Sequence, residues 1–207
     1  MNPIMSLIML MASIFLVTVL NIVLKKNSKY LKKEIRWQHY LLGYFFIVYL
    51  IITLSQVVGF PSLSEYRHLL SINQPIFNPH INLVPFRDGI EITSILNIIL
   101  FIPLGFLLPT LWKKYRNLWS TFYYGLFFSL GIEFAQLFVR YRATDINDLI
   151  MNTIGTICGW IIFNTVKKVF RKYADKTVVD ISSSDTLPIK LEPYIYIMIA
   201  IICSFFQ

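Results

Sequence analysis

The feature that most constrains this chain is a series of long apolar runs. Six such runs follow one another through the 207 residues, at 4–24, 40–60, 94–112, 118–139, 149–166 and 194–206. A helix needs about 20 apolar residues to cross a bilayer, and the last run is the shortest. With 56% hydrophobic and 14% charged residues, the chain has too much apolar surface for a soluble core of this size. We therefore expect an all-α, polytopic membrane helical bundle of about six spans.

Basic residues alternate with these runs. Fifteen of the 19 Lys and Arg residues fall in segments 25–39, 113–117 and 167–193. The four others are Arg67, Arg87, Arg140 and Arg142. Because cytoplasmic loops collect Lys and Arg, we expect the first set to face the cytoplasm of a bacterial cell and both termini to lie outside. The net charge of +8 is then a sign of topology, and no nucleic-acid partner is expected.

The runs divide the chain into three parts. These are an N-terminal anchor span with a basic cytoplasmic loop (1–39), a core of four spans (40–170) and a cytoplasmic linker with a C-terminal span (171–207). The core contains a long outer loop, 61–93. In this loop Ser62 and Glu65 have the spacing of a capping box, which predicts a short helix.

Several polar residues occur inside the expected spans, where an ionisable group costs about 2.5–3.5 kcal/mol on insertion scales. Glu133 is the only acid of its run, Gln136 follows on the same helix face, and Asn97 begins another span. Two interpretations of Glu133 are open: a group that lines a site, or a carboxylate paired with a nearby Arg for packing. Pro103 similarly predicts either a bent packing helix or a broken helix beside a cavity.

The fifth run carries polar and small residues at helical spacing. These are Asp145, Asp148, Asn152, Gly155 and Gly159, which fall on one face. The glycine pair would let a neighbouring helix approach closely. Asp145 also suits a helix N-cap, with Asp148 near the positive end of the helix dipole, and this alternative gives both acids a structural role. By the charge rule, all of these polar residues lie at the outer end, which predicts one extracytoplasmic polar site.

The histidines and cysteines indicate no metal site. His39, His68 and His80 are isolated in the sequence, and we expect each to be a surface or interfacial residue. Cys158 and Cys203 lie in apolar runs and lack metal-ligand spacing. No cofactor is expected.

Four segments resemble motifs of a known family. They are Asn82-Leu-Val-Pro-Phe86, Asn97-Ile-Ile-Leu-Phe-Ile-Pro-Leu-Gly105, Glu133-Phe-Ala-Gln136 and Arg142-Ala-Thr-Asp-Ile-Asn-Asp148. Their order resembles that of the VanZ-like proteins, small bacterial membrane proteins linked to teicoplanin resistance, over about residues 40–166. The chain departs from the family at Asn147, where an acid is more common. The resemblance implies a role in susceptibility to lipoglycopeptides, which act on cell-wall precursors outside the membrane, but it implies no reaction.

Two classes of function fit these observations. In the first, the outer site binds the lipid-like part of the antibiotic or a lipid-linked cell-wall precursor, with membrane lipids around it. The expected binding residues are Asn82, Pro85, Phe86, Arg87, Asn97, Glu133, Gln136, Arg142, Asp145, Asp148 and Asn152. In the second, the protein is an enzyme of the cell envelope that acts on a lipid-linked substrate, with Glu133, Asp145 and Asp148 as acid, base or cation ligands. No established catalytic signature accompanies these carboxylates, and transport is a weaker third reading.

Overall fold

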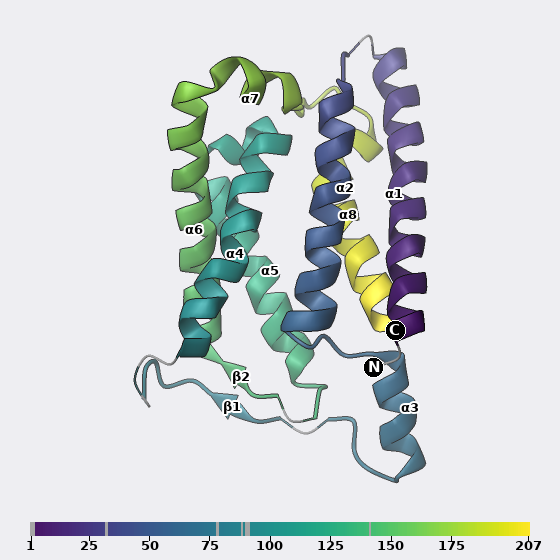
Figure 1. Cartoon of the computed structure of the whole chain (residues 1–207), viewed down its shortest axis with the longest axis vertical. Helices are drawn as coiled ribbons and strands as arrows, with labels where there is room; N and C mark the ends of the chain where they lie inside the picture. Colours follow the sequence, from purple (N-terminus) through teal and green to yellow (C-terminus); the bar gives the residue numbers. More distant parts are fainter. Residues whose placement is uncertain (1–2, 32, 78, 88, 90–91, 141) are drawn as a thin grey trace.

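The computed structural model describes residues 3–31, 33–77, 79–87, 89, 92–140 and 142–207. Within these residues, six long helices form one bundle (Figure 1). They are α1 (Pro3–Tyr30), α2 (Trp37–Ile52), α4 (Ile92–Leu111), α5 (Leu118–Gln136), α6 (Ile146–Val169) and α8 (Leu187–Phe205). Each expected apolar run corresponds to one of them, which confirms the all-α helical bundle.

Five of the six long helices are long and apolar enough to cross a membrane. The exception is α5, whose tyrosines, serines and Glu133 lower its mean hydropathy. The last helix, α8, begins at Leu187, well before the apolar run at 194–206, and its 19 residues meet the length requirement. The chain is therefore a multi-pass membrane protein, and among its six described long helices α5 alone does not meet these criteria for a membrane span.

The remaining elements are short. They are a π-helical turn (Thr53–Val57) that continues α2, α3 (Leu63–Ser71), β1 (Ile81–Asn82), a 3-10 turn (Lys113–Arg116), β2 (Thr144–Asp145) and α7 (Arg171–Thr177). The capping prediction for the outer loop is confirmed. Ser62 is the N-cap of α3, and its hydroxyl accepts a hydrogen bond from the backbone N–H of Glu65 at 3.2 Å.

Helices α4 and α6 are packed with almost no space between their backbones. A Cβ atom on Gly155 would overlap the carbonyl of Ile98, and one on Gly105 would overlap the carbonyl of Thr156. The close approach predicted from Gly155 and Gly159 is thus confirmed. Helix α4 is continuous through Pro103, so the alternative of a helix broken at this proline is not what the structure shows.

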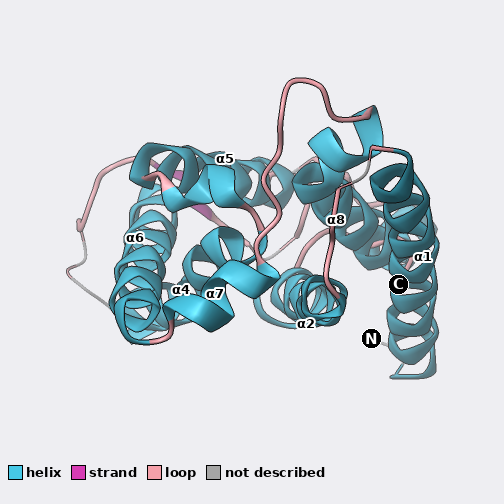
Figure 2. Cartoon of the chain, turned by 90° about the horizontal axis from the view of Figure 1, so that it is seen from above, coloured by secondary structure: helices cyan, strands magenta, loops and turns pink. Residues whose placement is uncertain are grey.

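The bundle has two halves, visible from above in Figure 2. One half contains α4, α5 and α6, and the other contains α1, α2 and α8, with α2 packed against α4. Aromatic rings join the halves, because Trp112 at the end of α4 contacts Phe46 of α2 and Tyr196 of α8 edge-on or at a tilt. All three rings are fully buried.

The prediction that His39 is a surface or interfacial residue is wrong. Its side chain is 0% exposed, and its Nε2 lies 2.7 Å from Oε1 of Glu192 on α8. The other ring nitrogen lies 3.0 Å from the carbonyl oxygen of Thr177, and the indole N–H of Trp112 donates to Oε2 of Glu192 at 2.9 Å. A polar residue at the start of α2 is buried here because its partners come from two distant segments.

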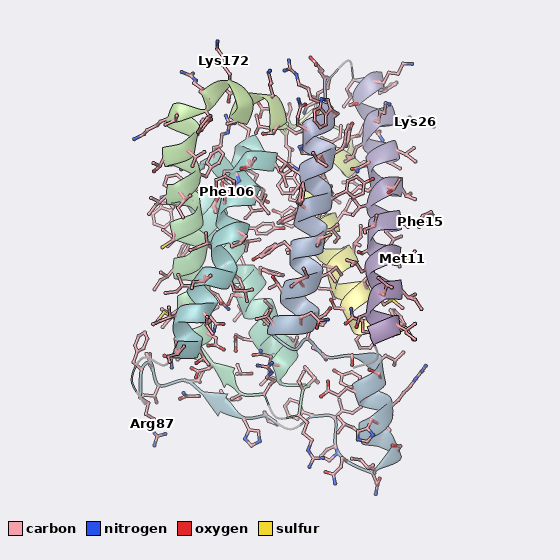
Figure 3. All side chains as sticks on the ribbon, in the orientation of Figure 1. Met11, Phe15, Lys26, Arg87, Phe106 and Lys172 are labelled. Carbon is pink, nitrogen blue, oxygen red and sulfur yellow. The ribbon has the colours of Figure 1, made fainter. Side chains whose placement is uncertain are left out.

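The two sets of basic residues lie at opposite ends of the bundle. Figure 3 shows Lys26 and Lys172 at one end and Arg87 at the other. Helix α3, β1 and β2 lie at the Arg87 end, and α8 ends there (Figure 1). We refer to the Arg87 end as the outer end and to the Lys172 end as the inner end, following the expected topology.

Candidate functional site

Two loops that are far apart in the sequence meet at the outer end. Strands β1 and β2 pair in parallel, with Ile81 opposite Thr144 and Asn82 opposite Asp145. The backbone N–H of Thr144 extends the pairing by donating to the carbonyl of His80 at 2.8 Å. This short pairing places the loop that follows Asn82 directly beside the start of α6.

Asp145 connects three segments at this point. It is the N-cap of α6, as one of the two interpretations predicted, and its Oδ1 accepts from the backbone N–H of Asn147 at 2.8 Å. Its Oδ2 accepts from the side-chain amide of Asn82 at 3.3 Å. Its own backbone N–H donates to Oε2 of Glu133 at 2.9 Å. Glu133 is only 3% exposed, so this carboxylate acts as an internal acceptor that fixes the start of α6 on α5.

The polar residues of α4 and α6 are also paired with each other. The side-chain amide of Asn97 donates to Oδ1 of Asp148 at 2.6 Å. One turn deeper, the amide of Asn152 donates to the hydroxyl of Ser129 on α5 at 2.9 Å. Asn152 is 2% exposed, and these bonds give the side-chain N–H groups of both asparagines an acceptor where water is scarce, whereas Oδ1 of Asn152 has no partner among the described residues.

The turn at 83–87 is held by Asn147 at the start of α6. The side-chain oxygen of Asn147 accepts from the backbone N–H of Phe86 at 2.8 Å. Phe86 has a φ of 53°, a left-handed conformation that a bulky residue adopts only under constraint. Pro85 and Arg87 lie in the same turn and are exposed. Asn147 thus acts as a hydrogen-bond acceptor for the loop.

Gln136 and Arg142 attach the end of α5 to the end of α2. The side-chain amide of Gln136 donates to the carbonyl of Val58 at 3.0 Å, and the guanidinium of Arg142 donates to the carbonyl of Val57 at 3.3 Å. The π-helical turn before these carbonyls and the positive φ of Gly59 (63°) direct them toward α5. A Cβ at Gly59 would lie 3.0 Å from nitrogen atoms of the Arg142 guanidinium. The guanidinium therefore packs directly against the backbone of Gly59.

A pocket of 530 Å³ opens beside this hydrogen-bonded frame. Polar side chains line most of it: Ser55, Ser62, Ser64, Glu65, Arg140, Arg142, Ser204 and Gln207. We call it the outer pocket. Of the eleven candidate residues, Arg142 alone lines it, and the others lie in the frame or in the exposed turn. The serines were missed because single serines in separate segments carry no periodic signal.

The carboxylates at the outer end are engaged by protein donors. Glu133 accepts from a backbone N–H, and Asp145 and Asp148 accept from asparagine side chains as described above. Among the residues that the structure describes, no three His, Cys, Asp or Glu side chains converge in a geometry that could hold a metal ion. This arrangement can position loops and, at Arg142, present a cation to a ligand.

These features define a multi-pass helical membrane protein in which two distant loops form one hydrogen-bonded outer end. Residues 45–168 match the family model VanZ/LLP1, and the chain belongs to this family. It is similar to Protein VanZ of Enterococcus faecium, with 33% identity over 109 residues that cover 50% of this chain and 67% of that protein. No solved structure matches it. Helices α1 and α8 lie outside the matched region.

Proposed function

We propose that this VanZ-like membrane protein contributes to resistance against teicoplanin and related lipoglycopeptides by binding an amphiphile at its outer end. The amphiphile is the lipid-like part of the antibiotic or a lipid-linked cell-wall precursor. The observation that carries the proposal is the outer pocket, because its polar side chains gather where α8 and the π-helical turn after α2, both parts of candidate membrane spans, end. A protein that binds amphiphiles at the membrane surface needs polar groups at such a position.

The candidate residues have two roles in this proposal. Arg142 contacts the polar head of the ligand through the guanidinium N–H groups that remain free of Val57, since arginine suits phosphate and carboxylate groups. The others hold the frame. The loops that shape the pocket are held by four polar side chains, those of Asn82, Glu133, Asp145 and Asp148. Three more polar side chains stabilise the helices next to them, those of Asn97, Gln136 and Asn152.

Resistance measurements test the proposal. Bacteria that express the Arg142→Gln variant should lose most of the teicoplanin resistance that the wild-type chain confers, while the variant accumulates normally in the membrane. Arg67→Gln is the matched control, because Arg67 lies on α3 at the same end but does not line the outer pocket. Equal resistance from both variants would contradict a ligand at Arg142.

The enzyme alternative makes a different prediction for Glu133. Glu133→Gln keeps an oxygen that can accept from the N–H of Asp145 but removes the charge and the exchangeable proton. A positioning role predicts near wild-type resistance, whereas acid–base catalysis predicts its loss. Mass spectrometry of lipid-linked precursors from the same cells provides the second readout: a precursor changed by the wild-type chain but not by Glu133→Gln would establish an enzyme and refute simple binding.

The outward orientation is tested by cysteine labelling in a cysteine-free background. Arg87 and Lys172 are both exposed and lie at opposite ends (Figure 3). In intact cells, a membrane-impermeant maleimide should label Arg87→Cys at once and Lys172→Cys only after permeabilisation. The reverse pattern would place the outer pocket in the cytoplasm and exclude direct contact with an external antibiotic.

A further inference from the structure

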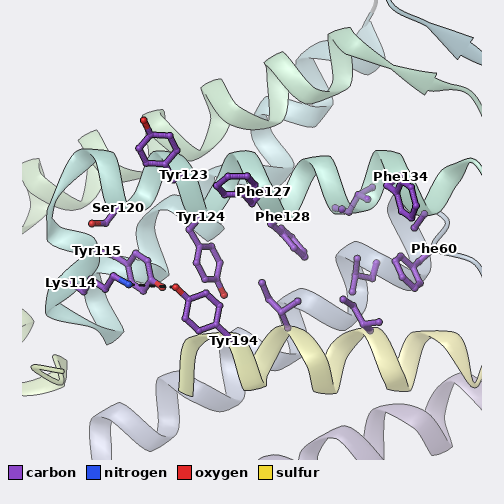
Figure 4. Close-up of a pocket in the computed structure, with 16 residues that line it drawn as sticks. Phe60, Lys114, Tyr115, Ser120, Tyr123, Tyr124, Phe127, Phe128, Phe134 and Tyr194 are labelled. Atoms are coloured by element: carbon purple, nitrogen blue, oxygen red, sulfur yellow. Dashed lines mark hydrogen bonds between the residues drawn. The ribbon is translucent and has the colours of Figure 1, made fainter. Parts of the chain in front are cut away.

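A long apolar groove separates α5 from α8. Its volume is 640 Å³, and eight of its 16 lining residues are aromatic. Figure 4 shows the rings along α5, with Phe60 and Phe134 at one end of the groove and Lys114 and Ser120 at the other. Phe127 and Phe134 are 64% and 62% exposed, so the groove opens sideways toward the lipid. We call it the α5–α8 groove.

The groove and the outer pocket meet at one residue. Phe60 lines both cavities, in a turn that follows α2. On one side of this ring lie the serines and arginines of the outer pocket, and on the other lie the aromatic rings of the groove. A polar cavity and an apolar groove that share a lining residue suit a ligand with a polar head group and an apolar chain.

The length of the groove limits the kind of chain that fits. Its lining extends along α5 from Ser120 to Phe134, which is about 21 Å at 1.5 Å per residue. One leaflet of hydrocarbon is about 15 Å deep, half of a typical bilayer core. A chain that enters from the outer end and fills the groove therefore extends past the midplane. This favours a single long hydrocarbon chain over the paired chains of a phospholipid, which end near the midplane.

The charges of the outer pocket favour an anionic head. Arg140 and Arg142 line it with one acid, Glu65. Burial of Glu65 in the first turn of α3 raises the pKa of this carboxyl, and the two arginine side chains outnumber it. Phosphate, like carboxylate, is an anionic group that arginine binds with two parallel hydrogen bonds.

We propose that the α5–α8 groove and the outer pocket form one site for a long-chain polyprenyl phosphate, with the phosphate at Arg142 and the chain along the aromatic rings. This inference rests on the proposed function for the outward orientation and specifies its ligand as the carrier lipid of a wall precursor. Helix α8 forms one wall through Tyr194, Ile197 and Ile201. This wall therefore comes from a helix outside the family-matched residues 45–168.

Gly131 provides a variant that blocks the groove without disturbing the fold. It lines the groove, and a Cβ atom built on it would meet no other atom within 4 Å. Gly131→Phe therefore places a ring in the space assigned to the chain. The matched control is Leu130→Phe, because Leu130 is its neighbour on α5, is 48% exposed and does not line the groove.

The experiment uses the full chain in nanodiscs and a polyprenyl phosphate that carries a photoreactive diazirine in its chain. Irradiation should label peptides of α5 and α8, and unlabelled polyprenyl phosphate should compete far better than phosphatidylglycerol. Gly131→Phe should lower labelling about tenfold, whereas Leu130→Phe should leave it unchanged. Arg142→Gln should weaken binding by about tenfold, as expected for the loss of a charge-assisted hydrogen bond.

Each contrary result overturns the inference. Labelling of other helices in the wild-type chain excludes the groove, whether or not Gly131→Phe folds. Equal competition by phosphatidylglycerol excludes the long chain, and competition only by an acylated antibiotic identifies a different ligand. A loss of binding in Lys114→Gln but not in Arg142→Gln puts the head at the inner end. If binding behaves as expected but Gly131→Phe cells keep full teicoplanin resistance, the lipid site stands and the proposed function fails.

Discussion

The buried cluster of His39, Trp112 and Glu192 gives a sharp prediction for stability. The carboxylate of Glu192 is 0% exposed and receives both the imidazole at 2.7 Å and the indole N–H at 2.9 Å. Glu192→Ala removes both acceptor oxygens and leaves the two rings without a partner in a dry interior. Glu192→Gln keeps one acceptor for Trp112 and one polar group for His39.

The two variants should differ in the free energy of unfolding. Removal of one partner from a buried ionic pair costs about 3–5 kcal/mol. For Glu192→Gln the cost should be about 1 kcal/mol, the net value of one ordinary hydrogen bond. For a chain of this size, each kcal/mol lowers Tm by about 2–4 °C, so we expect a loss of about 6–20 °C for Ala and about 2–4 °C for Gln.

The natural cysteines supply the assay. Cys203 is 3% exposed in α8, the helix that carries Glu192. In a Cys158→Ala background, Cys203 is the only thiol of the 207 residues, and a dye that fluoresces on reaction with thiols reports its exposure as detergent-solubilised protein is heated. Equal Tm values for Glu192→Ala and Glu192→Gln would refute the reasoning, because they would show that the acceptor oxygens do not stabilise the fold.

Two further predictions concern an ion pair and a helix interface. Arg116 donates to Asp175 at 2.7 Å and holds the pKa of this carboxyl below its ordinary value. The stabilisation from this ion pair is therefore present above the ordinary aspartate pKa and is lost as pH falls through the lowered pKa of Asp175. The Tm difference between wild type and Asp175→Asn should shrink in acid. A difference that grows in acid would contradict this. Gly105→Ala should prevent accumulation of folded protein, because the added Cβ overlaps the carbonyl of Thr156. Gly131→Ala adds a Cβ in open space and should raise Tm, since alanine is favoured over glycine in a helix by roughly 1 kcal/mol. Gel filtration measures the folded protein of both variants, and heating measures their Tm.

Local periodicity made much of the fold predictable. The spacing of Asp145, Asp148 and Asn152 with the two glycines predicted one face of α6 and the close approach of another helix to it, and the structure shows that this face packs against α4 and α5. The N-caps at Ser62 and Asp145 were predictable for the same reason, since a cap and its N–H partner lie within three residues.

Contacts between distant segments were not predictable in this way. The pairing of β1 with β2 consists of two residues on each side, too short to show alternation in the sequence. His39 follows a basic loop and resembles a surface residue, yet its partner Glu192 lies 153 residues further along the chain. In both cases the stabilising contact depends on how the bundle closes and not on neighbours in the sequence.

The outer end shows why polar residues at membrane depth indicate a site only indirectly. A polar group in a membrane span must find a partner, and Glu133, Asp148 and Asn152 find theirs in other helices of the same chain. Hydrogen bonds made within the protein are not available to a ligand. Binding therefore depends on side chains such as Arg142 that the frame holds at the edge of a cavity with donors to spare. The costly residues of the sequence locate the frame, and the outer pocket, where we propose that a ligand binds, lies beside it.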